Sequence, residues 1–130
     1  MNLSVPKVTV MMPVYNAAPY LAESIESVLR QDFPSFELVI YDDGSKDQSF
    51  EIAKRYRRDS RVRLFHSREN RGVAYARNRI LKLARGKYIA PHDADDMMLS
   101  GKLKRQVDLF ERDPRLGTRR QWRPSGVGTA

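Results

Sequence analysis

The sequence contains no cysteine and, among its 130 residues, only two histidines. Disulfide bonds and thiolate metal sites are therefore excluded, so any metal must be held by oxygen or imidazole ligands. His66 and His92 are not spaced as a pair of metal ligands, and both are interpreted as strand-end residues. The lack of cysteine agrees with a reducing compartment and predicts a cytoplasmic location.

Long hydrophobic runs are also missing. The longest apolar stretches, such as residues 10–15, are far shorter than the roughly 20 residues that cross a bilayer. No basic segment followed by an apolar run opens the sequence, so no signal peptide is predicted. With 41% hydrophobic and 31% charged residues, a chain of this length can bury one core and has no room for a second domain.

Positive charge is concentrated in the middle of the chain. The formal net charge is +8, yet residues 1–53 carry 3 basic and 8 acidic side chains, whereas residues 54–87 carry 13 basic and 2 acidic ones. Such a block attracts phosphate in a nucleotide diphosphate, in an anionic lipid headgroup at the inner face of a membrane, or in nucleic acid. Each basic side chain can equally be a solvated surface group.

A basic nucleic-acid-binding module is the main alternative from a different functional class. The block lacks the interleaved exposed aromatic residues that stack on bases, so no specific nucleic acid is predicted as a partner. Peripheral attachment to an anionic membrane through residues 54–87 remains open, because it needs positive charge alone.

Strand and helix patterns alternate along the chain. Apolar and β-branched runs predict strands at 7–12, 36–41, 61–66 and 87–90. Apolar residues spaced three and four apart predict helices at 20–31, from Ser45 onward, at 72–85 and at 97–110. Pro13 is expected to end the first strand, Ser45 and Gln48 to form a capping box, and Gly86 to close the third helix in a left-handed conformation. This order predicts an α/β fold with a mainly parallel sheet flanked by helices.

The apolar spacing ends with the fourth helix, whose predicted buried stripe runs from Leu99 to Phe110. From residue 117 the sequence has no periodicity and is rich in glycine, arginine and proline. One domain is therefore predicted at 1–116, followed by an unstructured tail at 117–130.

Three polar clusters fall at predicted strand ends, where ligands bind in open α/β sheets. The first, Asp42 and Asp43 followed by Gly44-Ser45, is either a simple turn or a place where a carboxylate accepts a hydrogen bond from a nucleotide base. The second begins at Asn70-Arg71-Gly72 and continues to Arg77, where a helix start and guanidinium groups favour phosphate. Arg77 is equally compatible with a solvated helix face.

The third cluster places Asp93, Asp95 and Asp96 directly after an apolar strand. Their mutual repulsion is costly unless a cation or strong hydrogen-bond donors offset it. Mg²⁺ and Mn²⁺ take oxygen ligands and keep open positions for phosphates, so these carboxylates are candidate metal ligands. In extended backbone Asp93 and Asp95 would point to the same side. A solvated acidic turn is the alternative.

Taken together, these motifs resemble the successive signatures of family 2 glycosyltransferases, which have the GT-A fold. The resemblance covers about residues 6–115. It rests on Pro13-Val14-Tyr15-Asn16, Asp42-Asp43-Gly44-Ser45, Asn70-Arg71-Gly72 with Ala76-Arg77-Asn78, and Gly86-Lys87-Tyr88-Ile89 leading to Asp93-Ala94-Asp95-Asp96.

The resemblance implies transfer of a sugar, with inversion, from a nucleotide diphosphate sugar to an acceptor hydroxyl, with Mn²⁺ or Mg²⁺ as cofactor. A UDP-sugar is the expected donor, and the acceptor is a saccharide or a lipid-linked molecule. The implied donor-binding residues are Pro13, Val14 and Tyr15 for the nucleoside, Asp43 with Asp42 for the base, Arg77 for the diphosphate, and Asp93 near the ribose or metal. The implied metal ligands are Asp95 first, with Asp93 and Asp96.

The sequence departs from the family pattern in two ways. Pro91-His92 stands where the family has aromatic or aliphatic residues; a proline there is expected only where the strand has no ladder hydrogen bond to donate. The family's general base lies on a later segment, so the chain is expected to be an N-terminal nucleotide-sugar-binding half with a GT-A fold incomplete at its C-terminus. Such a half is expected to be inactive by itself and, with an uncovered sheet edge, prone to self-association.

Overall fold

The computed structural model describes residues 5–113, which form a four-stranded sheet with four α-helices and one short 3-10 helix. The bounds are β1 (Val8–Val14), α1 (Ala18–Leu29), β2 (Phe36–Asp43), α2 (Ser49–Lys54), η1 (Arg55–Arg58), β3 (Val62–Ser67), α3 (Val73–Leu83), β4 (Tyr88–Pro91) and α4 (Lys102–Arg112). None of the described helices has the length and apolar character needed to cross a membrane. The predicted tail at 117–130 lies outside the described residues.

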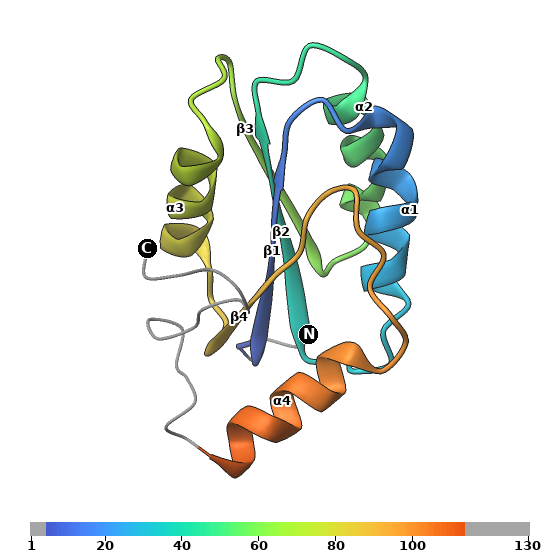
Figure 1. Ribbon diagram of the computed structural model, residues 1–130, viewed down its shortest axis with the longest axis vertical. Helices are drawn as coiled ribbons and strands as arrows, with labels where there is room; N and C mark the ends of the chain where they lie inside the picture. Colours follow the sequence, from blue (N-terminus) through green and yellow to red (C-terminus); the bar gives the residue numbers. More distant parts are fainter. Residues whose placement is uncertain (1–4, 114–130) are drawn as a thin grey trace.

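All strands pair in parallel, in the order β3-β2-β1-β4, which confirms the predicted α/β fold. Figure 1 shows α3 on one face of the sheet and α1 with α2 on the other, while α4 crosses beneath the lower end. Parallel pairing sends the C-terminal ends of neighbouring strands to the same edge. The loops after β1, β2 and β3 therefore gather at the top of Figure 1, away from α4.

Two hydrophobic cores, one on each face of the sheet, hold these layers together. The larger core joins alternate residues of β1 and β2 to α1 and α4 and includes the fully buried Leu21 and Leu103. The smaller core packs Met11 and Val39 against Ile80 of α3. Because full burial of such a side chain contributes about 1.5–3 kcal/mol, strands covered on both faces are apolar throughout.

The expectation that Pro13 ends the first strand was wrong, because β1 continues through Pro13 to Val14. Alternate residues of a parallel strand point their backbone groups to opposite neighbours. Since His92 N donates to Met11 O, the nitrogen of Pro13 faces the side where β4 has already ended. By the same alternation the nitrogen of Pro91 points away from β1. Proline at this position therefore costs no hydrogen bond between β4 and β1, as the sequence analysis expected.

Ser45 and Gln48 do not form the predicted capping box, because α2 begins only at Ser49 and has no side-chain cap at Gln48. The Oγ atom of Ser45 instead accepts a hydrogen bond from Asn16 N at 2.9 Å. Asp47 takes over the capping role, since its carboxylate accepts hydrogen bonds from Ser49 N at 2.9 Å and Ala18 N at 3.1 Å. The Asp47 side chain thus binds the N-terminal ends of both α1 and α2.

Gly86 does not close α3 in a left-handed conformation, because the helix ends at Leu83 with Ala84 as its C-cap, and the positive φ angles of the described glycines lie elsewhere. The reason for glycine is close approach. A Cβ atom at position 86 would lie 2.4 Å from Thr9 N and 2.6 Å from Val8 C. The prediction that Leu99 belongs to the buried stripe of the fourth helix was also wrong. Leu99 precedes α4 and is 70% exposed.

We predict that Gly86→Ala lowers the free energy of unfolding by about 1–3 kcal/mol, because the added methyl group overlaps β1 backbone that cannot swing aside. Chemical denaturation with equal m-values in both proteins measures the change. Gly72→Ala is the matched control, because a Cβ at that position meets nothing within 4 Å and tests only the backbone strain of its φ of +101°. Equal stability of wild type and Gly86→Ala would show that the close approach is not required.

Candidate functional site

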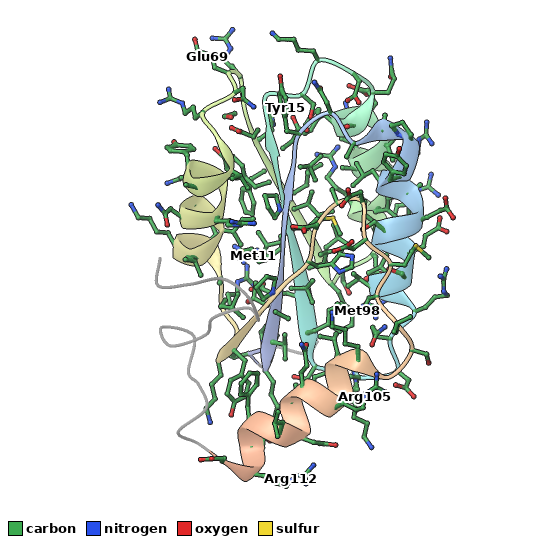
Figure 2. The ribbon with its side chains drawn as sticks, viewed as in Figure 1. Met11, Tyr15, Glu69, Met98, Arg105 and Arg112 are labelled. Carbon is green, nitrogen blue, oxygen red and sulfur yellow. The ribbon has the colours of Figure 1, made fainter. Side chains whose placement is uncertain are left out.

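The loops after β1 and β2 are joined by a pair of backbone-to-side-chain hydrogen bonds. Asn16, which has a φ of 50°, accepts from Lys46 N through Oδ1 at 2.8 Å, and its own N donates to Ser45 Oγ. Tyr15, the residue before Asn16, is 44% exposed at the upper edge of the sheet (Figure 2). The side chain of Val14 lies in the core, so only its backbone can line a ligand pocket.

The carboxylate of Asp43 is buried and fully engaged with the protein. Its Oδ1 accepts a hydrogen bond from Arg71 N at 2.9 Å, and its Oδ2 accepts one from Gly72 N at 2.8 Å. A longer contact of 3.4 Å joins Ser67 Oγ to Oδ1. Asp43 therefore anchors the β3–α3 loop and leaves little acceptor capacity for a base, the role that the sequence assigned to it first.

Asp42, the neighbouring residue, differs because one of its carboxylate oxygens accepts no hydrogen bond. Its Oδ2 accepts a hydrogen bond from Ser45 N at 3.1 Å, whereas its Oδ1 is buried and has no hydrogen-bond partner among the described residues. Burial raises the pKa of the Asp42 carboxyl above its ordinary value, although the hydrogen bonds from Ser45 act in the opposite direction. A buried acceptor without a partner is costly, and a ligand N–H would satisfy it.

Asp93, Asp95 and Asp96 do come together, but not in the extended geometry expected from the sequence. Asp96 N donates to Asp93 O at 3.0 Å, so the three residues lie on a turn. One carboxylate oxygen from each lies within 4.8 Å of the others, and all three side chains are exposed. Clustered hard oxygen donors of this kind fit Mg²⁺ or Mn²⁺. Arg77 lies alongside, with its Nη2 4.0 Å from Asp93 Oδ1.

His92 is a buried residue that holds this turn, a role that the strand-end interpretation missed. Its side chain is 4% exposed, and its Nε2 lies 3.1 Å from Asp96 O and 3.0 Å from Ser24 Oγ. Because a carbonyl oxygen only accepts, we assign the hydrogen to Nε2. Ser24 Oγ donates to Asp93 O at 3.2 Å. Burial lowers the pKa of His92, which favours the neutral ring.

Polar side chains of α1, and Gln31 just beyond its C-terminal end, continue this support along the loop of residues 92–101. Ser27 Oγ accepts a hydrogen bond from Met98 N at 2.8 Å, and Gln31 Nε2 donates to Leu99 O at 2.9 Å. Gln31 Oε1 also accepts from Leu103 N at the start of α4. In Figure 1 this loop runs beside α1 before it descends to α4. The sequence signal was available, because Ser24, Ser27 and Gln31 recur at helical spacing beside the apolar stripe.

Comparison with known proteins identifies the family to which this arrangement belongs. A model of glycosyl transferase family 2 matches residues 9–128. The chain belongs to glycosyl transferase family 2. Its resemblance to that family and its GT-A fold are thereby confirmed, and the match continues beyond the domain boundary predicted at residue 116.

Glycosyltransferases from several bacteria are similar in sequence. An uncharacterised glycosyltransferase of Haemophilus influenzae is 42% identical over 109 residues, which cover 83% of this chain and 44% of the relative. Glycosyltransferase GlyG of Streptococcus pneumoniae is 38% identical over 92 residues, which cover 70% of this chain and 31% of the relative. The chain thus spans less than half the length of these glycosyltransferases.

Solved glycosyltransferase structures share the fold. The crystal structure of S. aureus TarS 1-349 in complex with UDP-GlcNAc is 33% identical with a TM-score of 0.77, and the match covers 82% of this chain and 31% of the TarS 1-349 chain. The mannosyltransferase PcManGT from Pyrobaculum calidifontis, in complex with GDP-Man and Mn²⁺, is 31% identical with a TM-score of 0.76, covering 83% of this chain and 33% of that one.

We predict opposite effects of the same substitution at the two neighbouring aspartates of β2. Asp43→Asn should lower the free energy of unfolding by about 1.5–3 kcal/mol, because an amide replaces a carboxylate that accepts two backbone hydrogen bonds. Asp42→Asn should leave stability at neutral pH unchanged or raised. Denaturation of both variants without ligand measures the difference, and equal destabilisation would contradict the distinction.

The pH dependence of stability should separate the two residues further. The pKa of Asp42 is raised in the folded protein, so its stabilising contribution is present below the unfolded pKa of about 4 and is lost as the pH rises through the folded value. Asp42→Asn should abolish that loss and flatten the stability profile above pH 4. An unchanged profile would show that Asp42 titrates normally in the folded state.

Proposed function

We propose that this chain binds the donor substrate of an inverting glycosyltransferase, which transfers a sugar from a nucleotide diphosphate sugar to a hydroxyl group. The observation that carries the proposal is the unpartnered, buried Oδ1 of Asp42 beside the exposed ring of Tyr15, on the sheet edge from which the carboxylate cluster (Asp93, Asp95 and Asp96) also emerges. In this proposal Asp42 and Tyr15 serve the base of the nucleotide sugar, and the carboxylate cluster serves its diphosphate through a metal.

Asp42, rather than Asp43, accepts the hydrogen bond from the base in this proposal. Uracil offers one ring N–H donor, and Asp42 Oδ1 is a buried acceptor that lacks one. Tyr15 contributes a ring face against the base, while Pro13 and the backbone of Val14 form the wall beneath it. Asp43 acts indirectly, because it fixes the loop that leads into α3.

The carboxylate cluster would hold Mn²⁺ or Mg²⁺, with Asp95 as the main ligand and Asp93 and Asp96 beside it. Such a metal supplies Lewis-acid neutralisation of the charge that develops on the departing diphosphate. Arg77 supports the same charge, since its exposed guanidinium is within 4.0 Å of Asp93 and can turn toward a phosphate. Asp93 would then contact the ribose or the metal.

A UDP-sugar is the proposed donor. TarS was solved with UDP-GlcNAc and PcManGT with GDP-Man and Mn²⁺, so the family binds more than one base. A carboxylate acceptor facing one ring N–H suits uracil. The acceptor is a saccharide or a lipid-linked molecule, and no general base is assigned within residues 5–113.

The base contact is tested by changing the ligand rather than the protein. The N3-methyl analogue of UDP has a methyl group in place of the ring N–H that would donate to Asp42, so the analogue should bind at least tenfold more weakly, as expected for loss of a hydrogen bond to a charged group. Isothermal titration with Mn²⁺ present measures both affinities. Equal binding of the two nucleotides would contradict the role of Asp42.

Metal dependence is tested separately. UDP should bind at least tenfold more tightly in Mn²⁺ than in EDTA, and Asp95→Asn should remove that difference while keeping the metal-free affinity. The exposed position of Asp95 also predicts an unchanged melting temperature without metal. If EDTA does not change the affinity of the wild type, the carboxylate cluster is a solvated turn.

The hydrogen bonds from α1 should tune this metal affinity without contacting the metal. Ser24→Ala and His92→Leu each release a carbonyl that shapes the turn, and loss of such outer contacts typically weakens metal binding 10–100-fold. Electron paramagnetic resonance of free Mn²⁺ with UDP present measures this effect. His66→Leu is the matched control at an exposed histidine. Wild-type Mn²⁺ affinity in both variants would show that α1 only stabilises the fold.

A further inference from the structure

A second concave surface lies on the opposite edge of the sheet from the carboxylate cluster. This edge cleft has a volume of about 540 Å³ and is formed by β3, the β3–α3 loop and α3. Its main lining residues are Tyr41, Ser67, Arg68, Arg71, Tyr75 and Arg79. Strand β3 and strand β4 occupy the two ends of the order β3-β2-β1-β4, so the cleft is separated from the residues proposed to bind the metal.

The geometry of α3 gives this helix two cationic sides. Tyr75 and Arg79 are four residues apart and share one side, which faces the edge cleft. Arg77 lies about 200° around the helix from both, because each residue turns the chain by about 100°, and it faces Asp93 instead. The cleft therefore does not use the arginine that serves the donor site.

Positive charge in the edge cleft is not neutralised by the protein. Within residues 5–113, no carboxylate lies within 4.0 Å of the guanidinium groups of Arg68, Arg71 and Arg79. One of these groups, that of Arg71, is held over the ring of Tyr75 at 5.3 Å from the centroid. Stacking restrains this side chain, so less entropy is lost when a ligand binds.

One acidic residue also lines the cleft. Glu69 is exposed at the tip of the β3–α3 loop, as Figure 2 shows. Three guanidinium groups and this carboxylate leave a formal charge of +2, which matches a phosphate dianion and exceeds what a carboxylate ligand needs. Removal of the Glu69 charge should therefore strengthen phosphate binding, whereas removal of an arginine should weaken it.

A tyrosine hydroxyl group completes the site. Tyr41 is 4% exposed, lies in the smaller core and lines the edge cleft. Its hydroxyl makes no hydrogen bond to any residue of the described part of the chain, and its ring meets that of Tyr75 edge-on at 6.3 Å between centroids. The hydroxyl is therefore available to donate to a ligand in the cleft, and a phosphate oxygen can accept from it.

We propose that the edge cleft binds a phosphate group, either free in solution or in the headgroup of an anionic lipid. Planar guanidinium groups from the β3–α3 loop and α3 would grip the phosphate oxygens in pairs, with the Tyr41 hydroxyl donating from the floor. The proposed phosphate site includes neither Asp42 nor the carboxylate cluster.

The first experiment titrates the full chain with inorganic phosphate in EDTA, while amide chemical shifts are followed by nuclear magnetic resonance. Shifts should centre on Tyr41, residues 67–72 and Arg79. Arg79→Gln should weaken binding at least about threefold, as for a partly exposed charge pair, and Tyr41→Phe should weaken it without changing net charge. Glu69→Gln should tighten it.

Arg57→Gln is the matched control, because it removes the same charge from the exposed η1 segment outside the cleft. If Arg57→Gln weakens phosphate binding as much as Arg79→Gln does, the attraction belongs to the basic block as a whole, and the proposal is wrong. Shifts confined to residues 93–96, or no saturable shifts, would also overturn it.

The second experiment identifies the source of the phosphate. Co-sedimentation compares vesicles of phosphatidylglycerol with vesicles of phosphatidylcholine, using the wild type, Arg79→Gln and Arg57→Gln. Loss of phosphatidylglycerol binding in Arg79→Gln alone assigns the cleft to a lipid headgroup. The cleft is assigned to a soluble phosphate under two conditions. The chain must not bind the vesicles, or must bind them equally well with Arg79→Gln, and its binding of inorganic phosphate must depend on Arg79. Independence of Arg79 in both experiments refutes the site.

Discussion

The parallel pairing of β1 with β2 on one side and β4 on the other is the constraint on which the site depends. It brings the ends of strands that are far apart in sequence to one edge. Its stability comes from side chains buried on both faces, such as Met12 toward α1 and Met11 toward α3. The core thus fixes the positions of polar loops that contribute little to it.

The carboxylates at this edge are of two kinds. Some accept hydrogen bonds from the protein backbone with both oxygens, and others have at least one oxygen that can still accept a hydrogen bond or bind a metal. The oxygens of Asp43 accept hydrogen bonds from backbone N–H groups of the β3–α3 loop, and those of Asp47 accept from the backbone at the starts of α1 and α2. Asp42 Oδ1 and the carboxylate cluster, in contrast, have unused acceptor capacity. Structural carboxylates anchor the loops, and of the remaining ones the carboxylate cluster is exposed whereas Asp42 is buried. Preorganisation of this kind lowers the cost of binding an anionic ligand and its metal.

Helix α1 has a second role besides packing. Its apolar stripe covers the sheet, while Ser24 and Ser27 of the helix, with Gln31 just beyond its end, hydrogen-bond to backbone groups from Asp93 to Leu103. An exposed loop with three adjacent carboxylates repels itself and would sample many shapes. Buried hydrogen bonds from a rigid helix restrict it, and His92 adds one bond that an aliphatic residue at that position cannot make.

The sequence by itself determined the alternation of strands and helices, the parallel sheet and the edge where polar residues collect, because buried strands and amphipathic helices have distinct periodicities. It could not decide between Asp42 and Asp43, since adjacent strand residues face opposite sides and their hydrogen-bond partners come from distant loops. Pro13 and Gly86 were misread for the same reason, and His92, although it does lie at a strand end, has a hydrogen-bonding role that the sequence did not indicate. Their roles depend on where β4, Thr9 and Asp96 lie in space, and only tertiary packing sets those positions.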